Sequence, residues 1–180
     1  MKIPLPKLKA MIRFFGTYTD KSLLGKVKLM KLFYFADFGH LKKYGVPITW
    51  DTYIHLDYGP VPSGIMDLVS TVTEDLDNSV LADTIRIEKT ESNYLHRIVP
   101  LKKFVEQDER LFSKREIEVM KEVCARFATK TAKEIEDASH KESAWRETYL
   151  LQEISYSLAA KDNNCLVSKE EIELALKILN

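Results

Sequence analysis

The chain is poor in cysteine and lacks any long apolar run. It contains two cysteines, Cys124 and Cys165, among 180 residues. They show no CxxC spacing, so neither a disulfide framework nor a zinc ribbon is expected. No run of about 18 apolar residues occurs, which argues against a transmembrane helix. The first residues also lack the apolar core of a signal peptide. We therefore expect a protein of the reducing cytosol that does not enter a membrane.

The sequence motifs of several common enzyme classes are also absent. The chain contains no GxSxG nucleophile elbow, no phosphate-binding GxxxxGK[ST] and no dinucleotide-binding GxGxxG. Its six glycines are too few for a glycine-rich cofactor cradle. The sequence therefore predicts a protein that is not an enzyme and that binds no cofactor.

Charge is balanced over the whole chain but unevenly distributed along it. Residues 1–50 carry ten basic and two acidic side chains, whereas residues 51–100 carry three basic and nine acidic ones. We expect such blocks to neutralise each other within the fold. The alternative is a nucleic-acid-binding regulator, in which lysines would contact phosphates and affinity would fall steeply with salt. No recognition-helix or zinc-finger pattern accompanies these lysines, and a solvated helix face is the simpler interpretation. The lysines are Lys21, Lys26, Lys28, Lys31, Lys42 and Lys43.

Several helices are predicted from apolar residues at helical spacing. A first helix starts near Pro6 and is closed by Gly16, and the longest occupies residues 23–44 before Gly45. Another helix resumes around residues 65–72. Three capping boxes, in which a hydroxyl residue is followed three positions later by a glutamate, mark further helix starts. These are Ser113 with Glu116, Thr131 with Glu134, and Ser168 with Glu171.

Strand signals occupy a smaller part of the chain. Residues 79–101 predict a β-hairpin, with Glu91-Ser92-Asn93 as its turn and Leu95 on the returning strand. Residues 53–58 predict a short strand, and the segment Gly59–Ser63 predicts a turn that continues neither a helix nor a strand.

The fold class follows from these elements. Residues 149–166 fit either helix or strand, so the prediction leaves both open. We expect a single α+β domain over residues 1–180, with about six helices beside a small antiparallel sheet. The hairpin of residues 79–101 forms that sheet, and residues 53–58 are a further strand that could join it.

Histidine and aspartate residues at matching spacing suggest a metal site as an alternative function. Asp37 and His40 lie three apart on a helix and share a face, and His55 and Asp57 share a face of the predicted strand. With His140 from a later helix, the set Asp37, His40, His55 and His140 would suit a metal-dependent hydrolase. The simpler interpretation is that His40 is a hydrogen-bonded structural histidine with Asp37 as its partner. No HExxH motif groups these ligands.

Aromatic residues cover more than one face of the long helix. Phe33 belongs to the stripe that must face the core, whereas Tyr34 and Phe38, four residues apart, lie on another stripe. A helix that is apolar over most of its circumference is usually central to a fold. The alternative is a partner groove, because exposed aromatic residues are enriched at the energetic centres of interfaces.

Two sequence blocks together resemble a known family. The segment KLFYFAD at residues 31–37 is followed by His40-Leu41 and Pro47-Ile48-Thr49, and YGPVP occupies residues 58–62. Ser139-His140 and Ala144-Trp145 follow far downstream. In this order and spacing, the blocks resemble the Panacea domain, also described as SocA-like or phage-associated GepA-like. The resemblance covers roughly residues 5–150.

The resemblance implies an antitoxin. Proteins of this family are encoded beside varied small toxins and neutralise them by direct binding. One branch delivers its toxin to a ClpXP-type protease as a proteolytic adaptor, and other branches carry an added DNA-binding module that this chain does not show. The family is not known for catalysis and has no agreed metal ligands.

The contact residues expected for the partner come from the aromatic stripe and the YGPVP corner. A stiff Gly-Pro corner serves folding without any partner, and Trp145 is either a core plug or an interface anchor. The alternative is that these residues present a contiguous patch to the toxin, and an aromatic surface is also compatible with a homodimer. The partner-binding residues that we expect are Tyr34, Phe38, Tyr58, Gly59, Pro60, Val61 and Trp145.

Overall fold

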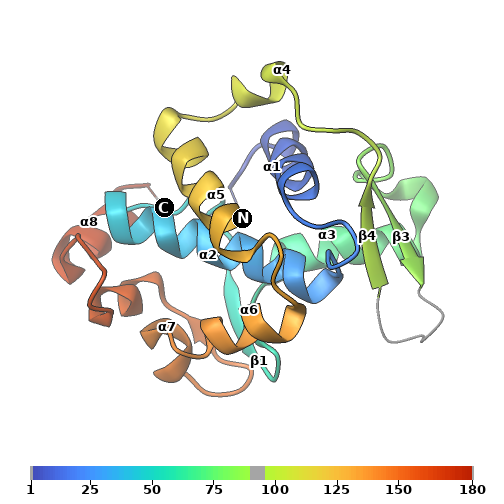
Figure 1. The fold of residues 1–180 in the computed structure, drawn as a ribbon. Helices are drawn as coiled ribbons and strands as arrows, with labels where there is room; N and C mark the ends of the chain where they lie inside the picture. The colour runs from blue at the N-terminus through green and yellow to red at the C-terminus, as the bar shows by residue number, and fades with distance from the viewer. Residues whose placement is uncertain (1, 90–95, 180) are drawn as a thin grey trace.

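The computed structural model describes residues 2–89 and 96–179, and it is mainly helical with two small antiparallel sheets (Figure 1). The predicted α+β class is confirmed. In the described part of the chain, six α-helices have eight residues or more, as predicted. They are α1 (Leu5–Tyr18), α2 (Lys26–Tyr44), α3 (Ser63–Glu74), α5 (Lys114–Phe127), α6 (Ala132–Ser139) and α8 (Lys169–Leu179). Shorter helical turns are α4 (Glu106–Glu109), α7 (Ser143–Arg146), η1 (Leu76–Asn78) and η2 (Tyr156–Lys161).

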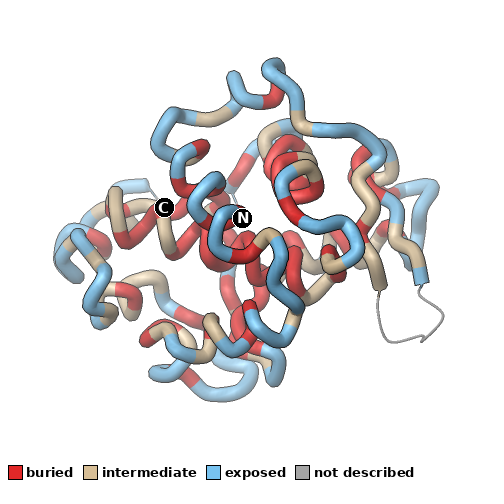
Figure 2. The backbone as a smooth tube through the Cα atoms, in the orientation of Figure 1, coloured by how far each residue is buried: buried red, intermediate tan, exposed pale blue. Residues whose placement is uncertain are grey.

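Helix α2 is the centre of the fold. It packs against α1, α5, α6, β2, β4 and η2, so its buried residues extend around the helix (Figure 2). Its first turns hold Leu29, Leu32 and Phe33 fully buried, and each such side chain stabilises the fold by roughly 1.5–3 kcal/mol. Gly45 ends the helix in the left-handed conformation, with φ of 81°, as the sequence predicts.

The other helix boundaries largely follow their sequence signals. All three predicted capping boxes form: Ser113, Thr131 and Ser168 each exchange hydrogen bonds with the glutamate three residues later. Helix α1 differs, because it continues past Gly16 to Tyr18. A Cβ atom at Gly16 would lie 2.0 Å from Pro100 Cγ, so this glycine permits close packing against β4 and does not stop the helix.

A three-stranded antiparallel sheet lies under α2, with the order β2-β1-β5. It contains β1 (Tyr53–Leu56), β2 (Gly59–Pro62) and β5 (Glu153–Ile154). The prediction that the segment Gly59–Ser63 continues neither helix nor strand is wrong, since its first four residues form β2 and Ser63 begins α3. Strand β2 is at an edge of the sheet, where prolines without an N–H group are tolerated.

The second sheet is the hairpin predicted over residues 79–101. Its strands β3 (Ile85–Lys89) and β4 (His96–Pro100) pair in antiparallel register, and the hairpin lies at the end of the molecule opposite α8 (Figure 1). The predicted turn Glu91-Ser92-Asn93 and Leu95 lie outside the described residues. Residues 53–56 do not join this sheet, because β1 pairs with β2 and β5.

The ambiguous segment of residues 149–166 contains both kinds of structure, namely the short strand β5 and the 3-10 helix η2. Ile154, whose alternation suggested a strand, pairs with Tyr53 of β1. No helix within residues 2–89 or 96–179 is long and apolar enough to cross a bilayer.

Candidate protein-binding site

The turn between β1 and β2 forms a rigid corner that presents one exposed aromatic ring. We use "the β1–β2 corner" for Tyr58, Gly59 and Pro60. The side chain of Tyr58 is 66% exposed, whereas Gly59 and Pro60 are buried. Gly59 has φ of 91°, and a Cβ atom there would lie 2.7 Å from Ser139 Oγ and 3.1 Å from His140 Nε2. The backbone of the corner is therefore pressed against the C-terminal end of α6, which only glycine allows.

A buried lysine of α2 forms a hydrogen bond to the β1–β2 corner. The Lys31 ammonium donates a hydrogen bond of 2.8 Å to the carbonyl oxygen of Pro60, and the residue is 1% exposed. Burial lowers the pKa of Lys31 to about 7, against a smaller opposing effect of the Glu136 carboxylate. Lys31 thus positions the β1–β2 corner. The same hydrogen bond joins the KLFYFAD segment, which contains Lys31, to the YGPVP segment, which contains Pro60.

The interpretation of the lysines as a solvated face is wrong for half of them. Lys28, Lys31 and Lys42 are each at most 4% exposed. Lys28 donates to the carbonyl oxygens of Ala128 and Lys130, and Lys42 forms ion pairs with Glu142 and Asp162. We expect the basic residues of 1–50 to pair with acidic residues of 51–100, and Lys9 forms such an ion pair with Asp83. Other basic residues of the first block instead pair with acidic residues between positions 108 and 162.

Behind the corner, Trp145 is held between two histidines. Its ring stacks on His140 with centroids 3.9 Å apart and on His55 with centroids 4.4 Å apart. Burial lowers the pKa of both histidines, which favours neutral imidazoles against the indole. The buried atoms Trp145 Nε1 and His140 Nε2 have no hydrogen-bond partner within the described part of the chain.

A groove adjoins the exposed ring of Tyr58. Its volume is about 590 Å³, which is within the range of sites that accept small ligands or peptide side chains. Tyr58 therefore projects at the edge of a concave surface. The lining residues are Gly25, Lys26, Val27, Tyr58, Met66, His96, Ala132 and Glu136.

The predicted contact patch around Tyr34, Phe38, Tyr58 and Val61 is not formed as one surface. Tyr34 and Phe38 are 0% and 1% exposed because other elements cover α2, and Val61 of β2 is 7% exposed. The rings of Tyr34 and Phe38 pack 4.4 Å apart in the core. Of the predicted residues, Tyr58 remains accessible at the β1–β2 corner, and Trp145 is partly buried against His140 beside it.

The predicted metal ligands Asp37, His40, His55 and His140 do not form a group of neighbouring ligand atoms among the described residues. Asp37 accepts hydrogen bonds from the backbone of Ile48 and Thr49 and from the Tyr53 hydroxyl, so it anchors the loop after α2. His40 is hydrogen-bonded, as the simpler interpretation holds, but its partner is the Val46 carbonyl oxygen instead of Asp37.

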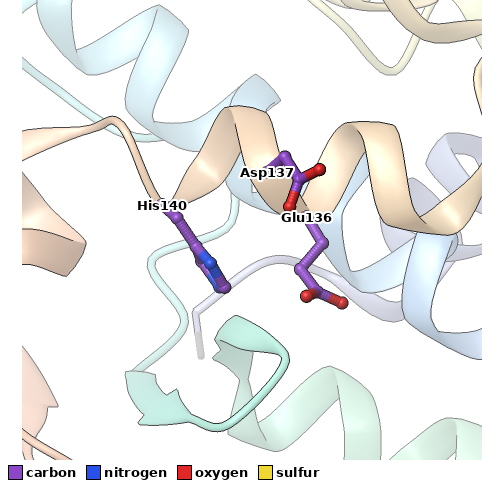
Figure 3. A group of neighbouring side chains, drawn as sticks. All are labelled: Glu136, Asp137 and His140. Carbon is purple, nitrogen blue, oxygen red and sulfur yellow. The ribbon is translucent and has the colours of Figure 1, made fainter.

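A different group of possible ligands surrounds His140. Glu136, Asp137 and His140 offer ligand atoms that all lie within 4.8 Å of one another, and Figure 3 shows the His140 ring and the Glu136 side chain projecting on the same side of α6. The Lys133 ammonium lies 2.9 Å from both carboxylates and already supplies a positive charge there. The sequence patterns considered above did not identify Glu136 and Asp137. Their positions three and four residues after Lys133 on a helix are the pattern that indicates them.

The comparisons with known proteins give one match. The family model described as "Antitoxin SocA-like, Panacea domain" matches residues 29–146, about two thirds of the chain, from α2 through the β1–β2 corner to Trp145. Neither the curated proteins nor the solved structures contain a match to this chain. The matched residues include the elements that build the β1–β2 corner. Because the match covers more than half of the chain, the chain belongs to the SocA-like antitoxin Panacea domain family.

Proposed function

We propose that this protein is a cytoplasmic antitoxin that binds a cognate toxin protein directly and acts without catalysis. The observation that carries the proposal is the family match over residues 29–146, which includes every element of the β1–β2 corner. Family membership supports the antitoxin role, and the corner is the feature we assign to toxin contact.

The toxin contact is centred on Tyr58. Its ring is exposed beside a groove of about 590 Å³, and aromatic side chains next to concave surfaces often dominate binding energy. Lys31 and Gly59 hold the corner in one conformation, so little conformational freedom is lost when a partner docks. Trp145 supports this contact surface indirectly, because its ring stacks on His140, which lies next to Gly59.

Two modes of neutralisation fit this surface. In the first, the antitoxin masks the toxin in a stable complex. In the second, it delivers the toxin to a ClpXP-type protease. Co-expression with the product of the adjacent gene separates them, since masking leaves a complex that co-purifies, whereas delivery removes the toxin unless the protease gene is deleted.

The experiment that tests the contact surface compares two exposed positions during this co-expression. We expect Tyr58→Ala to restore toxicity and to weaken the complex by at least about tenfold, as for a central interface aromatic. Ile178→Ala is the control, because Ile178 is 70% exposed on α8. Equal neutralisation by both variants would place the toxin contact elsewhere. Light scattering of the antitoxin alone and of the complex determines whether the antitoxin is also a homodimer.

A further inference from the structure

A second concave site lies between α2 and α5, apart from the β1–β2 corner. Its volume is about 160 Å³, and Gly39 of α2 forms part of its wall. A cavity of about 150 Å³ lined by apolar side chains in another protein holds benzene, so this site has room for one aromatic ring. The apolar lining is Phe35, Phe38, Val119, Val123 and Phe127.

Asn164 and several charged side chains complete the lining, and most of the charged ones are already paired. The Lys43 ammonium lies 2.6 Å from the Glu122 carboxylate. Lys42 forms ion pairs with Glu142 and with Asp162 beyond the cavity. These contacts neutralise the lysines and the glutamates that line the cavity.

Arg126 differs from these cations. Its guanidinium lies over the rings of Phe35 and Phe127, at 5.1 and 4.6 Å from their centroids, and residues 2–89 and 96–179 supply it with no ion pair. Stacking on two rings orients the guanidinium plane and leaves its N–H groups available to a carboxylate. The cavity thus combines an apolar space for one ring with an oriented, unpaired cation.

We propose that this cavity binds a small aromatic carboxylate, with its ring among the phenylalanines and its carboxylate on Arg126. The volume of the cavity fits a single ring, and the positive charge of Arg126 favours an anion over a neutral analogue. The site is independent of the β1–β2 corner, so its ligand and the toxin do not compete for the same residues.

Benzoate and its neutral analogue benzamide are the probes. The full-length protein, labelled with ¹⁵N, is titrated with each while amide shifts and heat are recorded. We expect benzoate to shift amides of α2 and α5 that surround the cavity, and to bind at least about tenfold more tightly than benzamide, because a charge-assisted hydrogen bond is lost with the amide. Equal affinity for the two probes, or no shift around the cavity, overturns the proposal.

Two variants test the geometry. Arg126→Gln is expected to weaken benzoate binding by at least about tenfold. Its matched control is Arg115→Gln, since Arg115 is also an exposed arginine of α5 stacked on a ring, that of Tyr44 at 4.9 Å. Gly39→Ala adds a methyl group 3.4 Å from Val119 Cγ1 and is expected to weaken binding without unfolding the helix. If Arg115→Gln weakens binding as much as Arg126→Gln, the carboxylate is not on Arg126.

Discussion

The ammonium group of Lys31 donates a 2.8 Å hydrogen bond to the carbonyl oxygen of Pro60, although 29 residues separate them in the chain. This contact joins the central helix to the edge strand of the three-stranded sheet. Pro60 follows Gly59, whose backbone touches the end of α6, so three elements meet at one turn. The stability of the β1–β2 corner therefore depends on a few residues that can be tested individually.

Substitution of Gly59 is expected to destabilise the protein. Gly59→Ala adds a Cβ atom 2.7 Å from Ser139 Oγ at a residue with φ of 91°. The left-handed conformation alone costs roughly 1–2 kcal/mol for alanine, and the close contact adds to it. Urea unfolding measures the change. Gly39→Ala, in the middle of α2, is the control and is expected to keep or raise stability. Equal unfolding midpoints for the wild type and Gly59→Ala would contradict the strained turn.

Stability is expected to rise with pH above neutrality because of Lys31. Its pKa of about 7 in the folded protein lies below the ordinary 10.5, so the folded state binds fewer protons between these values. The free energy of unfolding therefore increases from about pH 7 towards pH 10. Lys31→Met is expected to reduce this slope, and Lys141→Met, at an exposed lysine, is expected to retain it. Unfolding by urea at several pH values measures both.

Asp37 is expected to have the opposite effect at acidic pH. Burial raises its pKa from 3.8 to about 6, against the lowering effect of hydrogen bonds from Thr49, Tyr53 and Ile48. The folded state consequently binds more protons between these values, and stability falls as pH rises from about 4 to 6. Asp37→Asn removes the ionisable group and should flatten this part of the curve. An unchanged slope in the variant would assign the dependence to other groups.

The buried hydroxyl of Tyr34 is expected to contribute nothing to stability. The atom has no hydrogen-bond partner within the described residues, and Tyr34 is 0% exposed. Tyr34→Phe should therefore leave the melting temperature unchanged or raise it, since an unsatisfied buried polar group is removed. Tyr53→Phe is the matched comparison and should lower it, because the Tyr53 hydroxyl donates to Asp37. A larger loss for Tyr34→Phe would reveal a partner for that hydroxyl.

Local signals in the sequence were sufficient for most helices and for the β3–β4 hairpin. Each capping box pairs residues three positions apart, so neighbouring residues alone specify the bond, and Gly45 ends α2 by its own conformational freedom. The prediction of a turn at Gly59–Ser63 is wrong, because a Gly-Pro segment indicates a turn unless its partner strand is known. The pairing of β2 with β1 at a sheet edge supplied that partner.

The sequence by itself determined the fold class, the central position of the aromatic helix and the family resemblance. Only the tertiary structure decided which side chains remain accessible. Tyr34 belongs to the KLFYFAD block and Tyr58 to the YGPVP block, yet Tyr34 is 0% and Tyr58 66% exposed. The physical reason is that burial depends on what packs around a residue: α2 is enclosed by helices and strands from distant parts of the chain, whereas the β1–β2 turn projects beyond its support on α6.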